Sequence, residues 1–268
     1  MELAKEVTDL YPDIVAAGGL SNALAQAFVE IKSLLQPAPL VNFTAHARTE
    51  GGSRACQMFI AAKERLFLFD FWSKGVSYGR GSTSSLHDAA QAIHFWITEQ
   101  PSLADMQHRF SFFIADEKGV AHEAGYAVEF QWETLRNHWA RSVDGNPDAM
   151  SPLPLIEAAM QQPELRQLFP FTSHYMLHFS RTTGYPFTND CPYAVPTENG
   201  RFRVYLTSRG ASAEDMGEML GEGDANEAVA ILVANLPPDC GPAVDGTADD
   251  LNESHSYPSI ESILKDRG

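Results

Sequence analysis

Residues 168–196, LFPFTSHYMLHFSRTTGYPFTNDCPYAVP, constrain the possible folds of this chain more than any other stretch. They concentrate seven Phe and Tyr rings among hydroxyl side chains, a composition that prefers a pleated, half-buried strand to a helix. We therefore predict a strand over residues 173–181. Glycine and proline at 184–186 predict a turn after it, and a second short strand is expected at 193–195.

Two histidines of this predicted strand, His174 and His178, are four residues apart and raise the question of a metal site. On a helix this spacing would place both imidazoles on one face, as in zinc-binding helices. On a strand, at about 3.3 Å per residue, they are roughly 13 Å apart, which is too far for one ion. The residue after His174 is Tyr175 rather than the glutamate of the metalloprotease motif. We expect structural histidines and no metal.

The same stretch supports one alternative, an enzyme site built from its polar side chains. Its members would be Ser173, His174, His178, Arg181 and Cys191, with the guanidinium binding an anion during acyl or phosphoryl transfer. Against it, an arginine after an apolar strand usually forms an ion pair, and a single cysteine usually packs as a small hydrophobic side chain. Serine elbows, P-loops, dinucleotide fingerprints, zinc helices and EF-hand loops do not occur in the sequence. We therefore assign no catalytic residue and no cofactor.

The motif FTSHYMLHFSR at residues 171–181 resembles an uncharacterised bacterial family of roughly the length of this whole chain. The helix expected at 152–167, the run EAVAILVANLP at 227–237 and the run FWSKG at 71–75 fit the same resemblance. Members of that family are sometimes labelled natural-product-biosynthesis proteins because of their genomic neighbourhood. The label implies an alternative function, an enzyme or accessory protein of such biosynthesis that uses the region of His174, His178 and Arg181. The resemblance carries no established activity and so no catalytic residue.

Hydrophobic periodicity alternates between helical and strand-like segments along the chain. Helical stripes run over residues 2–17 (divided by Pro12), 22–35, 85–99, 102–109, 132–141, 155–168 and 225–236, with a loose acidic helix at 211–223. Strand-like segments run over residues 41–48, 55–61, 65–72, 76–80, 110–115, the first part of 127–139, and 202–207. The segment 65–72 is apolar on both faces, so we expect a central strand that is buried on both sides.

Residues 142–154, SVDGNPDAMSPLP, are rich in Gly, Pro, Asn and Asp and form the best candidate for a domain boundary. On each side of it the chain runs helix, several antiparallel strands, helix. We therefore predict an α+β protein with two α/antiparallel-β units, residues 1–147 and 148–240. A polar acidic tail, residues 241–268, is expected to follow them.

Charge is the strongest compositional signal, because the formal net charge is −16 and is unevenly distributed. Residues 211–268 hold 13 acidic and 2 basic side chains, a net of −11 in 58 residues. Such a surface repels nucleic acids and anionic membranes and attracts a basic protein. We predict a binding protein, most specifically an immunity protein that neutralises a bacterial toxin through Glu214, Asp215, Glu218, Glu222 and Asp224. Simple solubility in the cytosol is the alternative explanation of the same charge.

The remaining composition predicts a cytoplasmic globular protein. Hydrophobic content of 44% and charged content of 20% fit a folded domain. The first residues lack a basic region followed by an apolar core, and no apolar run of about 18 residues occurs, so we expect neither a secretory signal nor a membrane span. Three widely spaced cysteines without a CxxC pair suit a reducing compartment and predict neither a disulfide scaffold nor a zinc ribbon.

Overall fold

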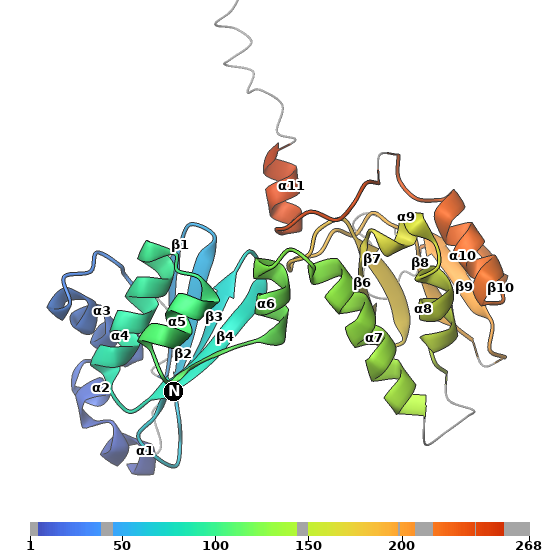
Figure 1. Ribbon diagram of the computed structural model, residues 1–268. Coiled ribbons are helices and arrows are strands. Elements are labelled where there is room, and N and C mark those ends of the chain that lie inside the picture. Colours follow the sequence, from blue (N-terminus) through green and yellow to red (C-terminus); the bar gives the residue numbers. More distant parts are fainter. Residues whose placement is uncertain are drawn as a thin grey trace, which may run out of the picture. The chain divides into compact units, whose positions relative to one another are not determined.

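The computed structural model describes residues 5–38, 45–143, 150–197, 199–206, 217–238 and 240–254. The chain divides into two compact units, one up to Gly125 and one from Tyr126 onward (Figure 1). Each unit contains a five-stranded antiparallel sheet with helices packed against it, which confirms the predicted α+β class. Among the described residues, no helix is both long enough and apolar enough to cross a membrane.

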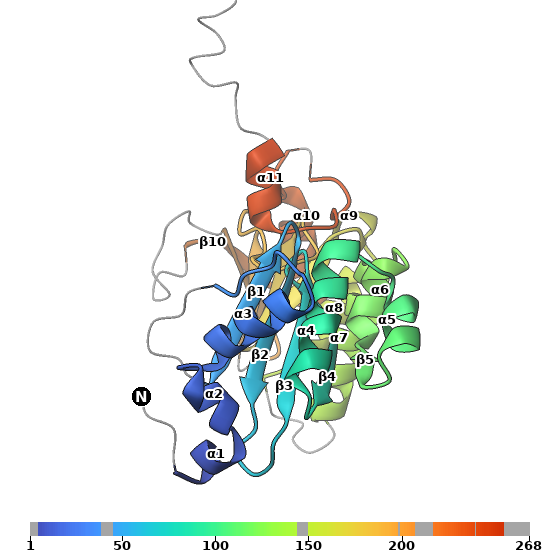
Figure 2. The ribbon, with the colours of Figure 1, turned by 90° about the vertical axis from the view of Figure 1, so that its left-hand side faces the viewer.

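The first unit begins with three short helices, α1 (Lys5–Leu10), α2 (Pro12–Ala16) and α3 (Leu20–Glu30). Its sheet follows the chain order β1 (His46–Gly51), β2 (Arg54–Ile60), β3 (Phe67–Ser73), β4 (Val76–Thr83) and β5 (Phe113–Ala115). Helix α4 (Leu86–His94), the π-helical turn η1 (Phe95–Glu99) and α5 (Leu103–Arg109) lie between β4 and β5, and α6 (Glu117–Glu123) follows β5. Figure 2 shows α3 and α4 against one face of this sheet.

Local sequence signals explain where several of these helices begin. Pro12 occupies the first turn of α2. A backbone N–H at this position forms no hydrogen bond within the helix, so proline, which lacks this N–H, is tolerated there. The hydroxyl of Ser85 accepts a hydrogen bond from the backbone N–H of Asp88 at 3.2 Å. Ser102 and Asp105 form a reciprocal capping box at the start of α5. The helices predicted at 85–99 and 102–109 are therefore confirmed.

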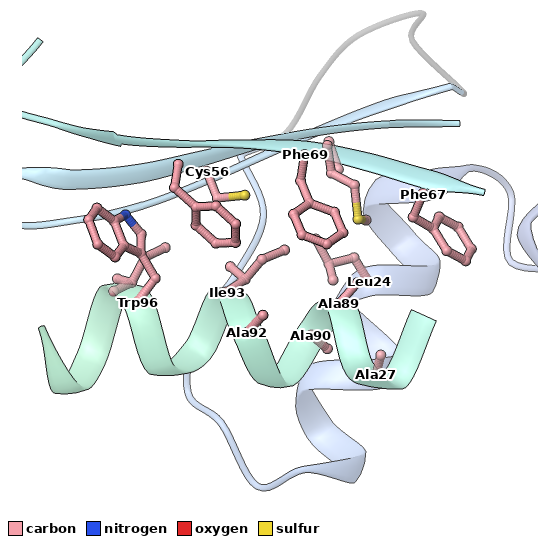
Figure 3. Close-up of a cluster of buried hydrophobic side chains, with 14 of the residues drawn as sticks. Leu24, Ala27, Cys56, Phe67, Phe69, Ala89, Ala90, Ala92, Ile93 and Trp96 are labelled. Atoms are coloured by element: carbon pink, nitrogen blue, oxygen red, sulfur yellow. The ribbon is translucent and has the colours of Figure 1, made fainter. Parts of the chain in front are cut away.

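The core of the first unit fills the space between the sheet and helices α3 and α4 (Figure 3). Alternate residues of β3 point into it, and Phe67, Phe69 and Phe71 are at most 2% exposed. The indole of Trp96 is fully buried, and its Nε1 donates a hydrogen bond to the carbonyl of Trp72 at 3.2 Å. This bond satisfies the single polar atom of a large ring that the core otherwise surrounds with apolar atoms.

The opposite face of the same sheet is less covered than predicted. Strand β3 is central in the strand order, as expected. However, Leu68 on its other face is 40% exposed, and Asp70 and Trp72 are only half-buried. The expectation of two buried faces is wrong because an apolar residue on a strand reports only a preference for burial.

The second unit begins with α7 (Ala127–Val143), α8 (Leu153–Ala159) and α9 (Pro163–Arg166). Its strands are β6 (Phe169–Ser173), β7 (Met176–Ser180), β8 (Tyr193–Pro196), β9 (Phe202–Leu206) and β10 (Glu218–Gly223), again in chain order across the sheet. Helix α10 (Ala225–Ala234) follows the last strand, and α11 (Ala248–Ser254) ends the described chain. The predicted strands at 193–195 and 202–207 and the helix at 225–236 are confirmed.

Helix α7 differs from the sequence-based prediction in two ways, the type of element formed by residues 127–139 and the position of the boundary between the units. Residues 127–139 were expected to begin as a strand, but the whole segment is helical. The helix packs on β6 and α8. Gln131 Nε2 donates to the carbonyl of Pro170 in β6 and Trp132 Nε1 donates to that of Arg166 in α9, both at 3.0 Å. The division between the units therefore falls after Gly125 rather than after residue 147.

The start of the predicted acidic tail is an ordered part of the second unit. Residues 240–247, which we call the strap, run beside the end of β7. The N–H of Val244 donates to the carbonyl of Arg181 at 3.0 Å, and the N–H of Thr183 donates to the carbonyl of Val244 at 3.1 Å. The N–H of Ala243 donates to the carbonyl of Gln167 at 2.9 Å. The polar composition of this segment does not predict an ordered strap, because the strap is held by backbone hydrogen bonds to distant residues.

Three further segments, residues 41–48, 117–123 and 218–223, differ from the prediction or are only partly described. Residues 117–123, directly after the strand expected at 110–115, form α6, a helix that the sequence pattern does not predict. Residues 218–223 form β10, and the loose helix expected at 211–223 is therefore wrong over this part. Gly221 and Gly223 disfavour a helix, whereas pairing with β9 supplies backbone partners. The first half of the strand expected at 41–48, residues 41–44, lies outside the described residues, and β1 begins at His46.

The hydroxyl of Tyr11 joins the N-terminal helices to the β2–β3 connection, and its removal should measurably destabilise the first unit. Tyr11 is fully buried; its oxygen accepts from Leu66 N at 2.8 Å and lies 2.9 Å from the carbonyl oxygen of Glu64. We predict that Tyr11→Phe lowers the free energy of unfolding by about 1–3 kcal/mol, because it leaves buried backbone groups unpaired. Urea denaturation measures this loss. Tyr126→Phe, at a residue that is 42% exposed, should change it by less than about 0.5 kcal/mol; equal effects of the two changes would contradict the assignment.

Candidate functional site

The strand predicted at 173–181 is confirmed over β7, Met176–Ser180, but its first residues belong to the end of β6 and to a hairpin turn. Strands β6 and β7 pair antiparallel, with Ser173 opposite Met176, and His174 and Tyr175 form the turn between them. The backbone of His174 adopts a left-handed conformation with φ of 57°, which a tight turn requires. The strand expectation was wrong here because the turn contains none of the Gly, Asn or Pro residues that usually mark a reversal.

The hairpin separates the two histidines completely. Ser173 and His174 lie at the exposed turn, where the hydroxyl and the imidazole Nδ1 are 3.5 Å apart. His178 lies within β7, and its ring stacks between two other aromatic rings. Among the described residues, no group of three or more His, Cys, Asp or Glu side chains is placed to hold a metal ion.

Four rings in register cross the sheet of the second unit on the face away from its helices. We call Phe171, His178, Tyr193 and Tyr205, one from each of β6 to β9, the aromatic row. Phe171 is opposite His178 and Tyr193 is opposite Tyr205 in the strand pairing. Successive ring centroids are 5.1, 4.7 and 5.6 Å apart, and the planes are inclined by 21° or less. Cross-strand neighbours of this kind stabilise a sheet and fix its register.

The β7–β8 connection extends this row beyond the edge strand. Phe187 stacks on Phe171 with the ring centroids 4.6 Å apart, and it also contacts Phe169 at 5.4 Å. Tyr185 packs against the edge of Phe187 and remains 70% exposed. On the β6 side, the aromatic row is therefore continued by Phe187 and then by the exposed ring of Tyr185.

His178 is held neutral by this environment. Its Nε2 is buried without a hydrogen-bond partner among the described residues. Burial lowers the pKa of His178 from 6.5 to about 4, because the charged imidazolium would lose its hydration between apolar rings. A neutral stacked ring has an architectural role and is poorly suited to exchange protons near pH 7.

Arg181 and Cys191 belong to a different cluster. The guanidinium of Arg181 pairs with the carboxylate of Asp190, which raises the pKa of Arg181. Cys191 is buried in the core that faces the helices, and its Sγ lies 3.8 Å from the Sγ of Cys240 in the strap. We call Arg181, Asp190, Cys191 and Cys240 the thiol cluster.

The five residues of the alternative enzyme site therefore occupy three places. Ser173 and His174 lie at the hairpin turn, His178 in the aromatic row, and Arg181 and Cys191 in the thiol cluster. Leu177 and Phe179, the neighbours of His178 along β7, belong to the helix-facing core, so His178 faces the other side of the sheet. This placement gives no support to a single reaction that uses all five side chains.

The acidic residues predicted to bind a partner also lie in different structural environments. Glu214 and Asp215 lie outside the described residues, between β9 and β10 in the sequence. Asp224 caps α10, accepting hydrogen bonds from the N–H groups of Asn226 and Glu227 at 2.9 Å. Glu218 is exposed on β10 and forms no ion pair with another described residue.

Glu222 is held by two arginines of the neighbouring strand and its turn. Its carboxylate lies 2.8 Å from Arg203 Nε and 3.4 Å from Arg201 Nε. The hydrogen bond from Arg203 holds the pKa of Glu222 below its usual range. Because all three side chains are exposed, this network keeps Glu222 ionised but remains accessible to other charged groups.

Exposed apolar side chains accompany Glu218 where the aromatic row reaches the far edge of the sheet. Strand β10 is the last strand of that sheet among the described residues. Met219 is opposite Tyr205 and is 56% exposed, and Leu206 is opposite Glu218 and is 37% exposed. We call Tyr205, Leu206, Glu218 and Met219 the β10 margin. The sequence predicts only its glutamate as a contact, because the pairing of β10 with β9, which brings Leu206 and Tyr205 to this edge, is not visible there.

Comparisons with known proteins match the second unit alone. Residues 126–247 match a family model described as "Family of unknown function (DUF6193)". The match begins with the second unit and ends with the strap. It confirms the expected resemblance to an uncharacterised family for this part of the chain. No curated protein and no solved structure matches.

Replacing the imidazole by an apolar ring should remove one source of acid sensitivity. The folded-state pKa of His178, about 4, lies below the ordinary value of 6.5, so between these pH values the unfolded chain binds more protons. The free energy of unfolding therefore falls as the pH drops through this window, by about 2–3 kcal/mol from this group. We predict that His178→Phe retains the stack at pH 7 and loses less stability than the wild type on going to pH 4. Chemical denaturation at a series of pH values measures this difference. His87→Gln, at an exposed histidine, should follow the wild-type curve, and an acid dependence in His178→Phe that equals the wild type would contradict the proposed role.

Two substitutions at Asp224 separate its capping role from its charge. Asp224→Ala removes the acceptor of both N–H groups and should lower the free energy of unfolding by about 1 kcal/mol. Asp224→Asn keeps a good N-cap without the charge and should cost only a few tenths of that amount. Thermal or urea denaturation compares the two. If both variants were as stable as the wild type, the cap would not contribute to the free energy of unfolding, and the Asp224 carboxylate would be available to bind a partner.

Proposed function

We propose that this protein is a cytoplasmic binding protein for a basic protein, most specifically an immunity protein that neutralises a bacterial toxin domain by direct contact. The observation that carries the proposal is the β10 margin. It combines an exposed carboxylate that lacks an ion-pair partner among the described residues with exposed apolar side chains at a sheet edge. Protein interfaces use the same combination of a charged rim and apolar or aromatic anchors.

Electrostatics decides the class of partner. With a net charge of −16, the chain repels polyanions and attracts cations over a distance set by the ionic strength. A toxin domain that acts on a nucleic acid or nucleotide carries a positively charged cleft, which an acidic binding protein can cover. Such association is fast at low salt and slows as salt is added.

The apolar residues of the margin supply the short-range part of the interaction. Met219 is an adaptable side chain that can follow the shape of a partner, and Tyr205 is a rigid ring already positioned by its stack on Tyr193. A pre-positioned ring loses little conformational entropy on binding. The edge position of β10 adds the possibility of backbone hydrogen bonds to an extended segment of the partner.

The glutamates contribute unequally in this proposal. Glu218 is the primary charged contact because no described residue neutralises it. Glu222 is secondary, since a lysine or arginine of the partner would have to compete with Arg201 and Arg203. Asp224 contributes charge only to the extent that its cap leaves the carboxylate accessible.

The proposal predicts a charge-dependent complex with the product of a neighbouring gene. The proteins encoded next to this chain are purified, and their association with it is followed by biolayer interferometry at several salt concentrations. We expect one basic product to bind, with an association rate that falls as salt rises. We expect Glu218→Lys to slow association about tenfold and to change the dissociation rate less.

Glu129→Lys provides the matched control for this charge reversal. Glu129 is an exposed residue of α7, which packs on β6 at the opposite edge of the same sheet. This variant should associate within about twofold of the wild-type rate because rim charges away from an interface contribute little. Equal slowing by both reversals would show that the β10 margin is not the interface. Binding that is insensitive to salt, or no binding by any neighbouring product, would contradict the proposed function itself.

A further inference from the structure

The two thiols of the thiol cluster are close in space although 49 residues separate them in the chain. Cys191 Sγ and Cys240 Sγ are 3.8 Å apart. Cys191 lies two residues before the start of β8 and is 3% exposed, whereas Cys240, at the start of the strap, is half-buried. A disulfide bond of about 2.05 Å therefore needs the sulfur atoms to approach by about 1.8 Å, which side-chain rotation and a small shift of the strap can supply.

The backbone on the Cys240 side of this pair is held in place. The N–H of Cys240 donates to the carbonyl of Pro237, and its carbonyl accepts from Gln167 Nε2, both at 3.2 Å. Further along the strap, Val244 and Gly246 bond to the segment that follows β7. The two thiols consequently face each other in the folded protein without any rearrangement of the strands.

Their surroundings give the two thiols different reactivity. The hydrogen bond between the two sulfurs, together with the charge of Arg181, lowers the pKa of Cys240. The same hydrogen bond, together with burial, raises the pKa of Cys191. Cys240 is therefore the thiol that ionises first and is the more exposed, whereas Cys191 is the protected neighbour. This is the arrangement of an attacking and a resolving cysteine.

We propose that Cys191 and Cys240 are a reversible oxidation site, at which a hydroperoxide converts the dithiol to a disulfide that fastens the strap to the sheet of the second unit. This inference is independent of the proposed binding function. It rests on the placement of both sulfurs and on the hydrogen bonds that hold the backbone on the Cys240 side.

The reaction balances with one equivalent of hydroperoxide. The thiolate of Cys240 attacks an oxygen of hydrogen peroxide, an S–O bond forms, the O–O bond breaks, and the sulfur loses two electrons to give a sulfenic acid and hydroxide. The sulfur of Cys191 then attacks the sulfenic sulfur, forming the S–S bond and expelling the second hydroxide. The two thiol protons combine with the two hydroxide ions, so the products are the disulfide and two water molecules.

The bond would change the chain most at the strap. It closes a loop between two cysteines that are 49 positions apart in the chain, which removes conformational freedom from any state in which the strap has detached. Ala243 and Val244, whose N–H groups already bond to Gln167 and Arg181, would then open less often. The oxidised protein should differ from the reduced one mainly in how firmly residues 240–247 are bound.

The test uses the reduced full-length chain and a small molar excess of hydrogen peroxide. Thiols counted after denaturation should fall from three to one, and the mass should fall by about 2 Da. Peptide mapping should place the bond between Cys191 and Cys240, and dithiothreitol should restore all thiols. Amide exchange at Ala243 and Val244 should slow at least about tenfold in the oxidised protein.

Two variants keep the outcome unambiguous. Cys56→Ser, which removes the buried cysteine of the first unit, should still lose both remaining thiols. Cys240→Ser should form no disulfide within one chain, and its Cys191 should stay reduced because it is buried. A bond that includes Cys56, a bond between two chains, addition of oxygen without a disulfide, or unchanged thiols would each overturn the proposal.

Discussion

Cross-strand stacking of the aromatic row is the interaction on which the arrangement of the second unit depends. Phe171, His178, Tyr193 and Tyr205 occupy one line across four strands, with each ring against the next. Because side chains alternate between faces, a slip of one residue in any pairing would turn a ring into the core and a core residue outward. The register that aligns the rings also directs Leu177 and Phe179 toward the helices and places Met219 beside Tyr205.

The two faces of this sheet consequently have different roles. The helix-facing side is closed by α8 and α10 and holds Cys191 against Cys240, where partial burial and a neighbouring guanidinium separate the reactivity of the two thiols. The other side carries neutral rings and ends at an exposed, acidic edge strand. The thiol cluster therefore lies on the opposite side of the sheet from the aromatic row, whose histidine is neutral. The family match ends with the strap, so both features lie in the matched segment.

Sequence alone predicted the elements whose signals are local. The helix at 85–99 could be predicted because Ser85 supplies a cap and the apolar stripe that follows has the helical period. The strands near 193 and 202 were recognisable from alternation. Helix α7 was misread because Val128, Phe130 and Trp132 alternate like a strand, while packing against β6 favours the helix. The turn at His174 was missed because it contains none of the Gly, Asn or Pro residues that usually mark a reversal.

Features that depend on pairing between distant segments could not be predicted in this way. The net charge and Glu218 were visible in the sequence, but the register that places Leu206 opposite Glu218 and Tyr205 opposite Met219 was not. Cys191 and Cys240 looked like two isolated cysteines because 49 residues separate them. Conversely, Asp224 and Glu222 resemble unpaired surface charges in the sequence. In the structure Asp224 caps α10, and Glu222 forms ion pairs with Arg201 and Arg203.

The central claim is that the protein acts by binding a basic protein at the acidic edge of the second sheet. Hydrogen exchange of the chain, measured with and without the purified basic product of a neighbouring gene, tests it most directly. The account predicts slower exchange on binding in Glu218–Gly223 and in the adjoining strand Phe202–Leu206, with little change around the β6–β7 turn. Protection confined to that turn, or to the first unit, would contradict it.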